Sequence, residues 1–439
     1  MPGAPRRALT RHGHANPCRP KLQVACWRAC AARHLFHAYQ PVECMARNSL
    51  KRGDRINPFL CRAWCRLKPI STPRCDTPLP RQGIFRILVC RPNHRLGNTL
   101  LLTPLISELE RHFKGAEIDL ISEGDIAKEV FGSYFSVRNV YCLPKRGFKH
   151  PIPFLRLIRQ VRRTQYDLIV DPCVDSGFSR ALTRLLRGTH KLGFSDAEGR
   201  DGLTLAAPVE VAGAHMAKRP VNLLHWALAL DGAQQDEVPT LDIRLTGPER
   251  HNGRQAIEQL LSGSRQSAPS PVVGLFANAT GNKRYPAAWW REFIDTFTTL
   301  CPTASMLELI PMHGRSMLGA EWPGYYSSDI RRMGAVMANL DLVITADCGV
   351  MHLAVASRTA TLGMFSVTDA SVYEPYGDDN HPLRTSGLTA SQAARQVVEN
   401  YPWLLAGETR PATASQPDGT ASASWPARAL ARASTQEDL

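Results

Sequence analysis

The chain has 439 residues and a net charge of +14, with 44% hydrophobic and 21% charged residues. This length allows two or three domains, each large enough to bury a core of its own. Because no apolar run approaches the ~20 residues that a membrane-spanning helix requires, the sequence predicts a protein that is soluble or bound to a membrane surface.

The basic residues and the cysteines are concentrated in residues 1–83. This segment contains 16 Lys/Arg and 3 Asp/Glu, a balance of +13. The remainder contains 37 Lys/Arg and 36 Asp/Glu and is nearly neutral. A nucleic-acid footprint would therefore concern this segment alone, and we expect no nucleic-acid partner. Without a visible signal peptide, a reducing cytosol is expected rather than a disulfide framework. Seven of the 12 cysteines lie in the segment: Cys18, Cys26, Cys30, Cys44, Cys61, Cys65 and Cys75.

Two interpretations of residues 1–83 stay open. One is a disordered extension that ends in the linker "STPRCDTPLPRQG", with Met45 as an internal start. The other is a basic and apolar segment that lies on an anionic membrane. The pairs Cys26/Cys30 and Cys61/Cys65 have only a loose C-x3-C spacing, so a zinc site is not the expected use of these cysteines.

From residue 84 onward, short apolar runs alternate with helical patterns. "FRILVC" has strand composition, and the next segment spaces Leu101, Leu105, Leu109 and Phe113 four residues apart on one helical face. The pattern predicts strands at 85–90, 116–122, 137–144, 166–172 and 190–194, and helices at 97–113, 152–165 and 176–188. Such alternation is typical of right-handed βαβ units around a parallel sheet.

A second alternating series follows a break at about 235–270, which contains one predicted helix, 254–261. It predicts strands at 272–278, 305–312, 341–347 and 359–366, and helices at 286–300, 329–340, 349–357 and 388–405. The sequence thus predicts an α/β protein with two Rossmann-like, doubly wound domains, 84–245 and 246–406, that face a cleft. Residues 407–439 are rich in Ala, Ser, Thr and Pro and are expected to be a disordered tail.

Residues 341–377 carry the most informative motif. A buried strand is predicted to end at Asp347, Cys348 and Gly349 make the turn, and His352 lies in the first turn of the next helix. Free N–H groups at a helix start bind anions, and glycine lets a phosphate approach the backbone. The segment is either a cradle for a nucleotide diphosphate, or a helix start that Asp347 caps with His352 packed in the core.

The segment "NATGNKRYPAAWW", residues 278–290, follows another predicted strand. Its polar loop holds Thr280, Gly281 and Lys283 before Pro286 starts a helix. Lys283 would neutralise a departing diphosphate; the alternative is an ordinary surface lysine.

Four segments in order resemble glycosyltransferase family 9, the lipopolysaccharide heptosyltransferase family, between about residues 86 and 404. They are "RILVCRPNHRLGNTLLLTPLISEL", "GNKRYPAAWW", "ADCGVMHLAVA" and "MFSVTDASVYEPYG". The resemblance implies a GT-B fold and an inverting transfer without metal or cofactor. The C-terminal half would hold a nucleotide sugar, usually ADP-heptose, and the N-terminal half a lipid-linked lipopolysaccharide core-type acceptor.

The resemblance also implies roles for individual residues. Lys283 and Thr280 would contact the donor phosphates. The diphosphate and sugar of the donor would be surrounded by Asp347, Cys348, Gly349 and His352, with Thr368 and Asp369 near the same pocket. Arg91, Arg95 and Gly97 would face an acidic acceptor. The basic stretch "KRGFKHPIPFLRLIRQVRR" suits an anionic glycolipid, although it also fits a solvated helix face.

Asn98 stands where the family's loop has an acidic residue, the natural general base for the acceptor hydroxyl. An amide does not take up a proton at neutral pH. Three interpretations follow: His94 or Asp171 is the base, Asn98 orients an acceptor whose proton leaves to water, or the protein binds its ligands without turnover. Three further positions depart from the family pattern: Cys348 replaces a hydroxyl, Ser366 a glycine and Ala370 a proline. We predict a cytoplasmic glycosyltransferase, peripheral on the inner membrane, with a GT-B-like binding protein as the alternative.

Overall fold

The computed structural model describes residues 74–75, 77–144, 151–195, 201–230, 238–262 and 270–411, and the statements below concern these ranges. The expectations for most of 1–83, including Met45, Cys26/Cys30 and Cys61/Cys65, lie outside the described residues. The same holds for the tail beyond residue 411 and for residues 145–150 of the basic stretch.

The N-terminal half is built on a parallel sheet of six strands. They are β1 (Arg86–Cys90), β2 (Glu117–Glu123), β3 (Val137–Leu143), β4 (Tyr166–Asp171), β5 (Gly188–Phe194) and β6 (Leu205–Ala207). The order across the sheet is β3-β2-β1-β4-β5-β6. Ile87 of the central strand pairs with Ile118 on one side and Leu168 on the other. Central strands of a parallel sheet are covered on both faces, which explains the continuous apolar run of β1.

The helices of this half are α3 (Leu96–Leu100), α4 (Thr103–His112), α5 (Ile126–Phe131), α6 (Pro151–Val161), α7 (Gly177–Leu185) and α8 (Lys218–Ala227). A 3₁₀ helix, η3 (Val209–Ala212), precedes α8. The single helix predicted at 97–113 is wrong, because the chain forms two helices there. Pro104 lies in the first turn of α4 and has no N–H to continue the preceding helix. The sequence patterns also missed helix α8, and they missed α5 and the three-residue strand β6, which are too short to show a clear period.

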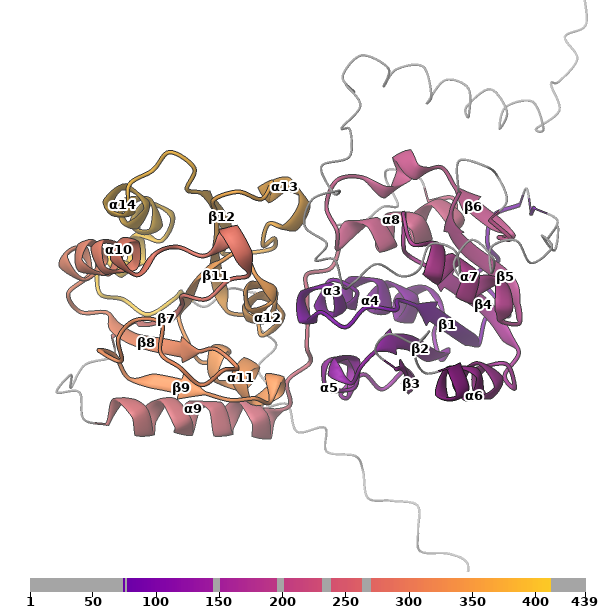
Figure 1. Ribbon diagram of the computed structural model, residues 1–439, viewed down its shortest axis with the longest axis horizontal. Coiled ribbons are helices and arrows are strands. Elements are labelled where there is room, and N and C mark those ends of the chain that lie inside the picture. The colour runs from indigo at the N-terminus through magenta and orange to yellow at the C-terminus, as the bar shows by residue number, and fades with distance from the viewer. Residues whose placement is uncertain are drawn as a thin grey trace, which may run out of the picture. The chain divides into compact units, whose positions relative to one another are not determined.

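The C-terminal half repeats this plan. Its strands are β7 (Val272–Phe276), β8 (Ser305–Ile310), β9 (Gly324–Tyr326), β10 (Leu342–Ala346), β11 (Ala360–Phe365) and β12 (Asn380–Arg384), in the order β12-β11-β10-β7-β8-β9. Its helices are α9 (Gly247–Leu261), η4 (Gly281–Lys283), α10 (Ala287–Leu300), α11 (Ile330–Met337), α12 (Gly349–Ala356), α13 (Ala370–Tyr373), α14 (Ala390–Asn400) and η5 (Pro402–Leu404). In Figure 1, α10 and α14 run side by side on one face of this sheet, and the two helices pack together.

Several C-terminal elements differ from the prediction. The strands β9 and β12 and the one-turn helix α13 were missed. Helix α9 begins at Gly247 rather than at Arg254, because Thr246 and Glu249 form a capping box that stabilises an earlier start.

The packed chain extends beyond the predicted domain limits at both ends. Leu79, which the sequence assigned to the extension, is 3% exposed, and its N–H donates to the carbonyl of Ala227 at 2.7 Å. Beyond residue 406, the N–H of Arg410 donates to Asp341 at 2.8 Å, and its guanidinium bonds the carboxylate of Asp379.

Arg331 of α11 joins the two halves and the segment between them, where it donates to the carbonyls of Ile243 and Arg244. Its guanidinium donates to the Glu249 carboxylate at the start of α9. It also donates to the Ser133 hydroxyl at 2.8 Å and the Glu129 carbonyl at 3.1 Å, next to α5. The hydrogen bonds from Arg331 to the Glu249 carboxylate hold the pKa of Glu249 at about 2. The Arg331–Glu249 ion pair therefore persists at neutral pH.

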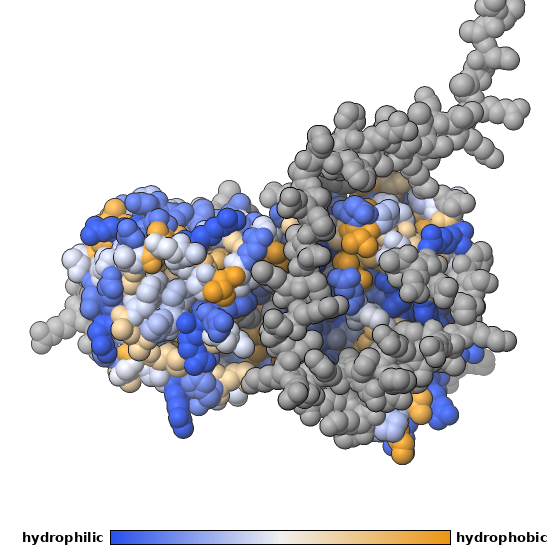
Figure 2. Space-filling view, turned by 45° about the horizontal axis from the view of Figure 1, so that its top comes forward, coloured by the Kyte–Doolittle hydropathy of each residue, from blue (hydrophilic) through white to orange (hydrophobic). Residues whose placement is uncertain are grey.

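None of the helices within the described ranges is long and apolar enough to cross a membrane. On the face of the C-terminal half in Figure 2, hydrophobic residues are scattered among hydrophilic ones. This face therefore carries no continuous apolar patch of the kind that marks a large interface.

Candidate functional site

Lys283 and Asp347 form an ion pair at the carboxyl edge of the second sheet. β7 and β10 are neighbours, so the segments that follow them leave the sheet side by side. Lys283 ends η4, after β7, and Asp347 comes directly after β10. The Lys283 Nζ lies 2.5 Å from Oδ2 of Asp347, whose side chain is only 5% exposed. Lys283 is thus no ordinary surface lysine.

The capping alternative for Asp347 is wrong. Helix α12 begins after Cys348, and no side chain caps its first turn by a hydrogen bond. The Sγ of Cys348 lies 3.5 Å from Oγ1 of Thr345, and burial raises the pKa of this thiol. The thiol stays neutral and is only a weak acceptor for the N–H groups of Val350 and Met351, which it faces, so a stronger acceptor such as a phosphate can take its place.

His352 is buried in the first turn of α12, as its second interpretation predicted. It is 4% exposed, and its ring centroid lies 6.5 Å from that of Tyr373. Burial lowers the pKa of His352 to about 4; the Asp347 carboxylate opposes this shift, while nearby His215 and Lys283 add to it. The imidazole is therefore neutral at pH 7 and adds no positive charge to the site.

Gly97 and Gly349 bring the first turns of α3 and α12 into contact. A Cβ at Gly97 would lie 3.0 Å from Cδ2 of His352 and 3.3 Å from the Cα of Gly349. A Cβ at Gly349 would lie 3.1 Å from the backbone nitrogen of Gly97. Both glycines are close-approach positions, and the groups they approach are each other and His352.

His215 makes a second contact between the halves, which the sequence analysis missed. Its Nδ1 accepts from the N–H of Ala217 at 3.2 Å, so Nε2 carries the proton and donates to the Glu374 carbonyl at 2.9 Å. The N–H of Met216 also donates to the Val372 carbonyl at 3.0 Å. Burial lowers the pKa of His215 and keeps it neutral. No periodicity or motif in the sequence marks this loop as a partner of α13.

Helix α13 stands beside the ion pair. Tyr373 places its ring 5.8 Å from the Lys283 Nζ. Asp369 is exposed and caps α13, accepting from the N–H of Ser371 at 3.0 Å; the hydrogen bonds from the side chain and the N–H of Ser371 lower the pKa of Asp369. Thr368 precedes it and is half-buried, and Thr280 is exposed next to η4. The Thr-Asp segment therefore has a local structural task, the start of the helix that carries Tyr373.

Asp171 is ruled out as a free general base. Its side chain is fully buried, and Oδ1 accepts from the Ser179 hydroxyl at 2.7 Å while Oδ2 accepts from Arg180 Nε at 3.0 Å. A carboxylate held by two donors of this kind is committed to the packing of α7 on β4.

The loop between β1 and α3 presents the remaining predicted residues. His94 has a side chain that is 53% exposed, and its Nδ1 lies 3.1 Å from Oε2 of Glu123. Asn98 is half-buried within α3. This loop thus offers one exposed imidazole that a carboxylate orients, and helix α3 after it offers one amide.

The two predicted acceptor arginines differ in setting. The Arg91 side chain is half-buried and donates to the Sγ of Cys173 at 3.4 Å. Arg95 is exposed and precedes α3 as its N-cap residue. Of the two, Arg95 is the cation that solvent reaches most freely.

The comparisons with known proteins agree with this architecture. Residues 154–299 and 328–401, half of the chain, match the sequence model of glycosyltransferase family 9 (heptosyltransferase). A family 9 glycosyltransferase from Veillonella parvula has a similar structure, with a TM-score of 0.60 at 16% identity over 75% of this chain and 99% of that one. No curated protein matches the chain.

Two E. coli enzymes have the same fold. One is heptosyltransferase WaaC with ADP-2-deoxy-2-fluoro heptose, with a TM-score of 0.53 at 20% identity over 72% of this chain and 99% of that one. The other is ADP-heptose lps heptosyltransferase II, with a TM-score of 0.54 at 15% identity over 74% and 99%. The predicted GT-B fold is confirmed.

The low pKa of His352 predicts a specific loss of stability in acid. Above pH 6.5, the ordinary pKa of the imidazole, it is neutral in both the folded and the unfolded chain. As the pH falls from 6.5 toward about 4, the unfolded chain binds a proton that the folded chain refuses. The free energy of unfolding should therefore drop by up to about 3 kcal/mol. His352→Gln should flatten this part of the profile in urea unfolding, whereas His251→Gln, an exposed control, should not. Equal slopes in the parent and His352→Gln would contradict the assignment.

Proposed function

Because the chain belongs to glycosyltransferase family 9, we propose that it transfers heptose from ADP-heptose to a lipopolysaccharide core-type acceptor, with inversion at the anomeric carbon. The observation that carries the proposal is the Lys283–Asp347 pair beside the first turn of α12. The ADP-2-deoxy-2-fluoro heptose bound to E. coli WaaC, and the name of E. coli ADP-heptose lps heptosyltransferase II, support the choice of donor.

The arrangement suits the charges of glycosyl transfer. As the glycosidic bond breaks, negative charge grows on the departing diphosphate and positive charge on the anomeric carbon. Lys283 and the N–H groups at the start of α12 would stabilise the diphosphate. We propose that these groups make a metal or cofactor unnecessary for the transfer. Asp347 holds the ammonium of Lys283 in place until the donor binds. Because His352 is neutral, it does not compete with Lys283 for the Asp347 carboxylate.

For the proton of the acceptor hydroxyl, we propose His94 as the general base. Its Nδ1 faces Glu123, which would orient the ring and favour the imidazolium that forms. Asn98 would position the acceptor hydroxyl by a hydrogen bond. Arg95 lies nearby and is exposed, so it would receive the anionic core sugar, while Gly97 packs against Gly349 and His352. The amide at Asn98 and the engaged carboxylate of Asp171 support the second candidate function, a binding protein without turnover.

Removing the ammonium should strongly reduce transfer. Lys283→Ala should lower kcat/KM by about 10²–10³, measured as ADP release from ADP-heptose with a core-type acceptor. Because the single change leaves Asp347 buried without its cation, Lys283→Ala/Asp347→Asn should be tested as well. Lys114→Ala, at an exposed lysine, is the control. A Lys283→Ala variant as active as the parent would refute the donor-site assignment.

The general base separates the enzyme from the binding protein. His94→Gln should lower kcat by about 10²–10⁴, with the affinity for ADP unchanged because the donor site is intact. Asn98→Asp should give no comparable gain. If Asn98→Asp instead creates turnover in a parent that has none, the native chain is a binding protein that lacks its base.

We propose that the enzyme works on the cytoplasmic face of the inner membrane, with α6 as one contact. This helix buries Phe154 and Ile158 but leaves Ile152 62% and Leu155 44% exposed. Its exposed side also carries two arginines, Arg156 and Arg159. Apolar residues between basic ones suit an anionic lipid surface.

Binding to vesicles tests this contact. Ile152→Ser/Leu155→Ser should weaken sedimentation with anionic vesicles, and each Arg→Gln change on the same side should cost about 5-fold. Met312→Ser, at an exposed apolar residue of the C-terminal half, should bind as the parent does. Unchanged binding by the α6 variants would refute α6 as the contact.

A further inference from the structure

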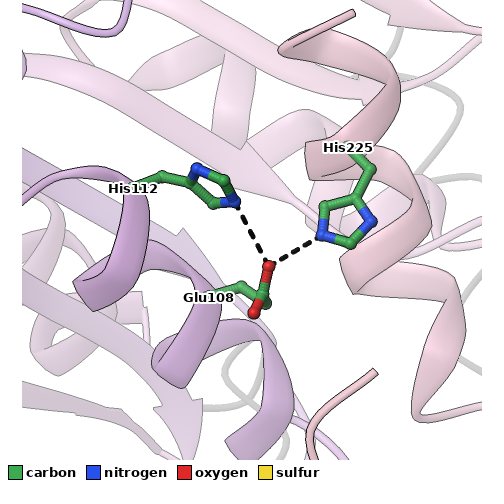
Figure 3. A group of neighbouring side chains, drawn as sticks. All are labelled: Glu108, His112 and His225. Carbon is green, nitrogen blue, oxygen red and sulfur yellow. Dashed lines mark hydrogen bonds and ion pairs between the residues drawn. The ribbon is translucent and has the colours of Figure 1, made fainter. Parts of the chain in front are cut away.

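Glu108, His112 and His225 form a cluster of side chains between α4 and α8 (Figure 3). Glu108 and His112 are four residues apart and lie on one face of α4, while His225 approaches from α8. Oε2 of Glu108 lies 2.7 Å from Nε2 of His225 and 3.3 Å from Nε2 of His112. The three ligand atoms all lie within 4.8 Å of one another.

The cluster is buried, and one of its nitrogens lacks a partner. The side chains of Glu108, His225 and His112 are 1%, 5% and 12% exposed. Within the described part of the chain, Nε2 of His112 is buried without a hydrogen bond, and its nearest partner is the ion-pair contact with Oε2 of Glu108 at 3.3 Å. A buried polar atom of this kind is costly and calls for an explanation.

We propose that Glu108, His112 and His225 bind one divalent transition-metal ion, zinc by preference. Two imidazoles and one carboxylate are a donor set that suits zinc, and the ion would give His112 Nε2 its missing partner. Zinc–ligand bonds of about 2.0–2.1 Å place the ligands of a tetrahedral site about 3.3 Å apart. The 3.3 Å between Oε2 of Glu108 and Nε2 of His112 matches this value. The 2.7 Å between Oε2 of Glu108 and Nε2 of His225 would have to lengthen by about half an ångström.

The cluster offers the kinds of donor atom that bind zinc: one carboxylate oxygen and two imidazole nitrogens. The partial exposure of His112 leaves a route for the ion and for a water as fourth ligand.

Arg111 is a neighbouring cation that opposes a metal. Its guanidinium bonds Oε1 of Glu108 at 3.2 Å, and the two histidines face the other oxygen, Oε2. Arg111 therefore acts as an outer partner that orients the carboxylate. Without an ion, the same residues would form only a hydrogen-bonded Glu108–His225 pair, and this is the alternative that the experiment has to exclude.

The ion would be structural rather than catalytic. Helix α4 follows the turn that holds Gly97 and Asn98, and α8 follows His215, which contacts the Glu374 carbonyl. A metal between α4 and α8 would fix the spacing of these two contacts to the C-terminal half. It plays no part in the transfer step proposed above, so the two proposals stand or fall separately.

Zinc binding by the untagged full chain tests the proposal. After chelation and dialysis against zinc, the parent should hold one zinc ion more than His112→Gln, and its affinity at this site should be at least about 100-fold higher, since even outer partners are worth 10–100-fold. His112 is the position to change because its Nε2 makes no hydrogen bond whose loss would unfold the chain. Zinc should also raise the Tm of the parent more than that of the variant. The exposed His313 supplies the control, His313→Gln.

The cysteines of residues 1–83 are the main competing ligands. Cobalt in place of zinc should give the spectrum of nitrogen and oxygen ligands, without thiolate charge transfer, and this signal should disappear in His112→Gln. Equal zinc content and equal Tm shifts in the parent and His112→Gln would overturn the proposal. A cobalt spectrum with thiolate bands that persists in the variant would overturn it as well, and would assign the metal to cysteines.

Discussion

The adjacency of β7 and β10 is the constraint on which the candidate site depends. In this strand order, the chain leaves β7 toward one side of the sheet and returns to β10 directly beside it, so two loops far apart in sequence open at the same carboxyl edge. That edge receives Lys283 from one loop and Asp347 from the other. A different strand order would separate the two charges by the width of at least one strand, about 4.8 Å.

The electrostatics of the site follow from burial around this pair. Asp347 is nearly inaccessible, so its charge requires Lys283 nearby. His352 lies so deep that the imidazolium is excluded, so the positive charge next to Asp347 comes from Lys283 and not from this histidine. His352 also packs against Gly97. The histidine beside the Lys283–Asp347 pair is therefore in contact with α3, the helix that carries Asn98.

The first half has a corresponding link between structure and function. The helices α4 and α8 hold the Glu108–His225 pair in its core, and the segments in front of them reach the other half through Gly97 and His215. The polar cluster behind these contacts and the contacts themselves lie on the same helices. The family match includes Lys283 and Asp347 at the sheet edge, and it begins after Glu108 and His112 of the cluster.

The sequence by itself determined the class of fold, the succession of the main strands along the chain, and the positions of Lys283 and Asp347 after the ends of strands. Continuous apolar runs and helical faces of period 3.6 are local signals. They can be recognised from neighbouring residues alone. Tertiary structure decided the rest. Short elements such as β6, β9 and α13 exist because neighbours pair with them or cap them.

The contacts of Gly97 with Gly349, of His215 with α13 and of Glu108 with His225 join residues more than 100 positions apart. No local pattern encodes such pairs. The same holds for Asp171, which a strand-end position made a candidate base and which its burial against Ser179 and Arg180 removed. Sequence thus named the chemical groups, and only packing decided which of them meet and which are free to react.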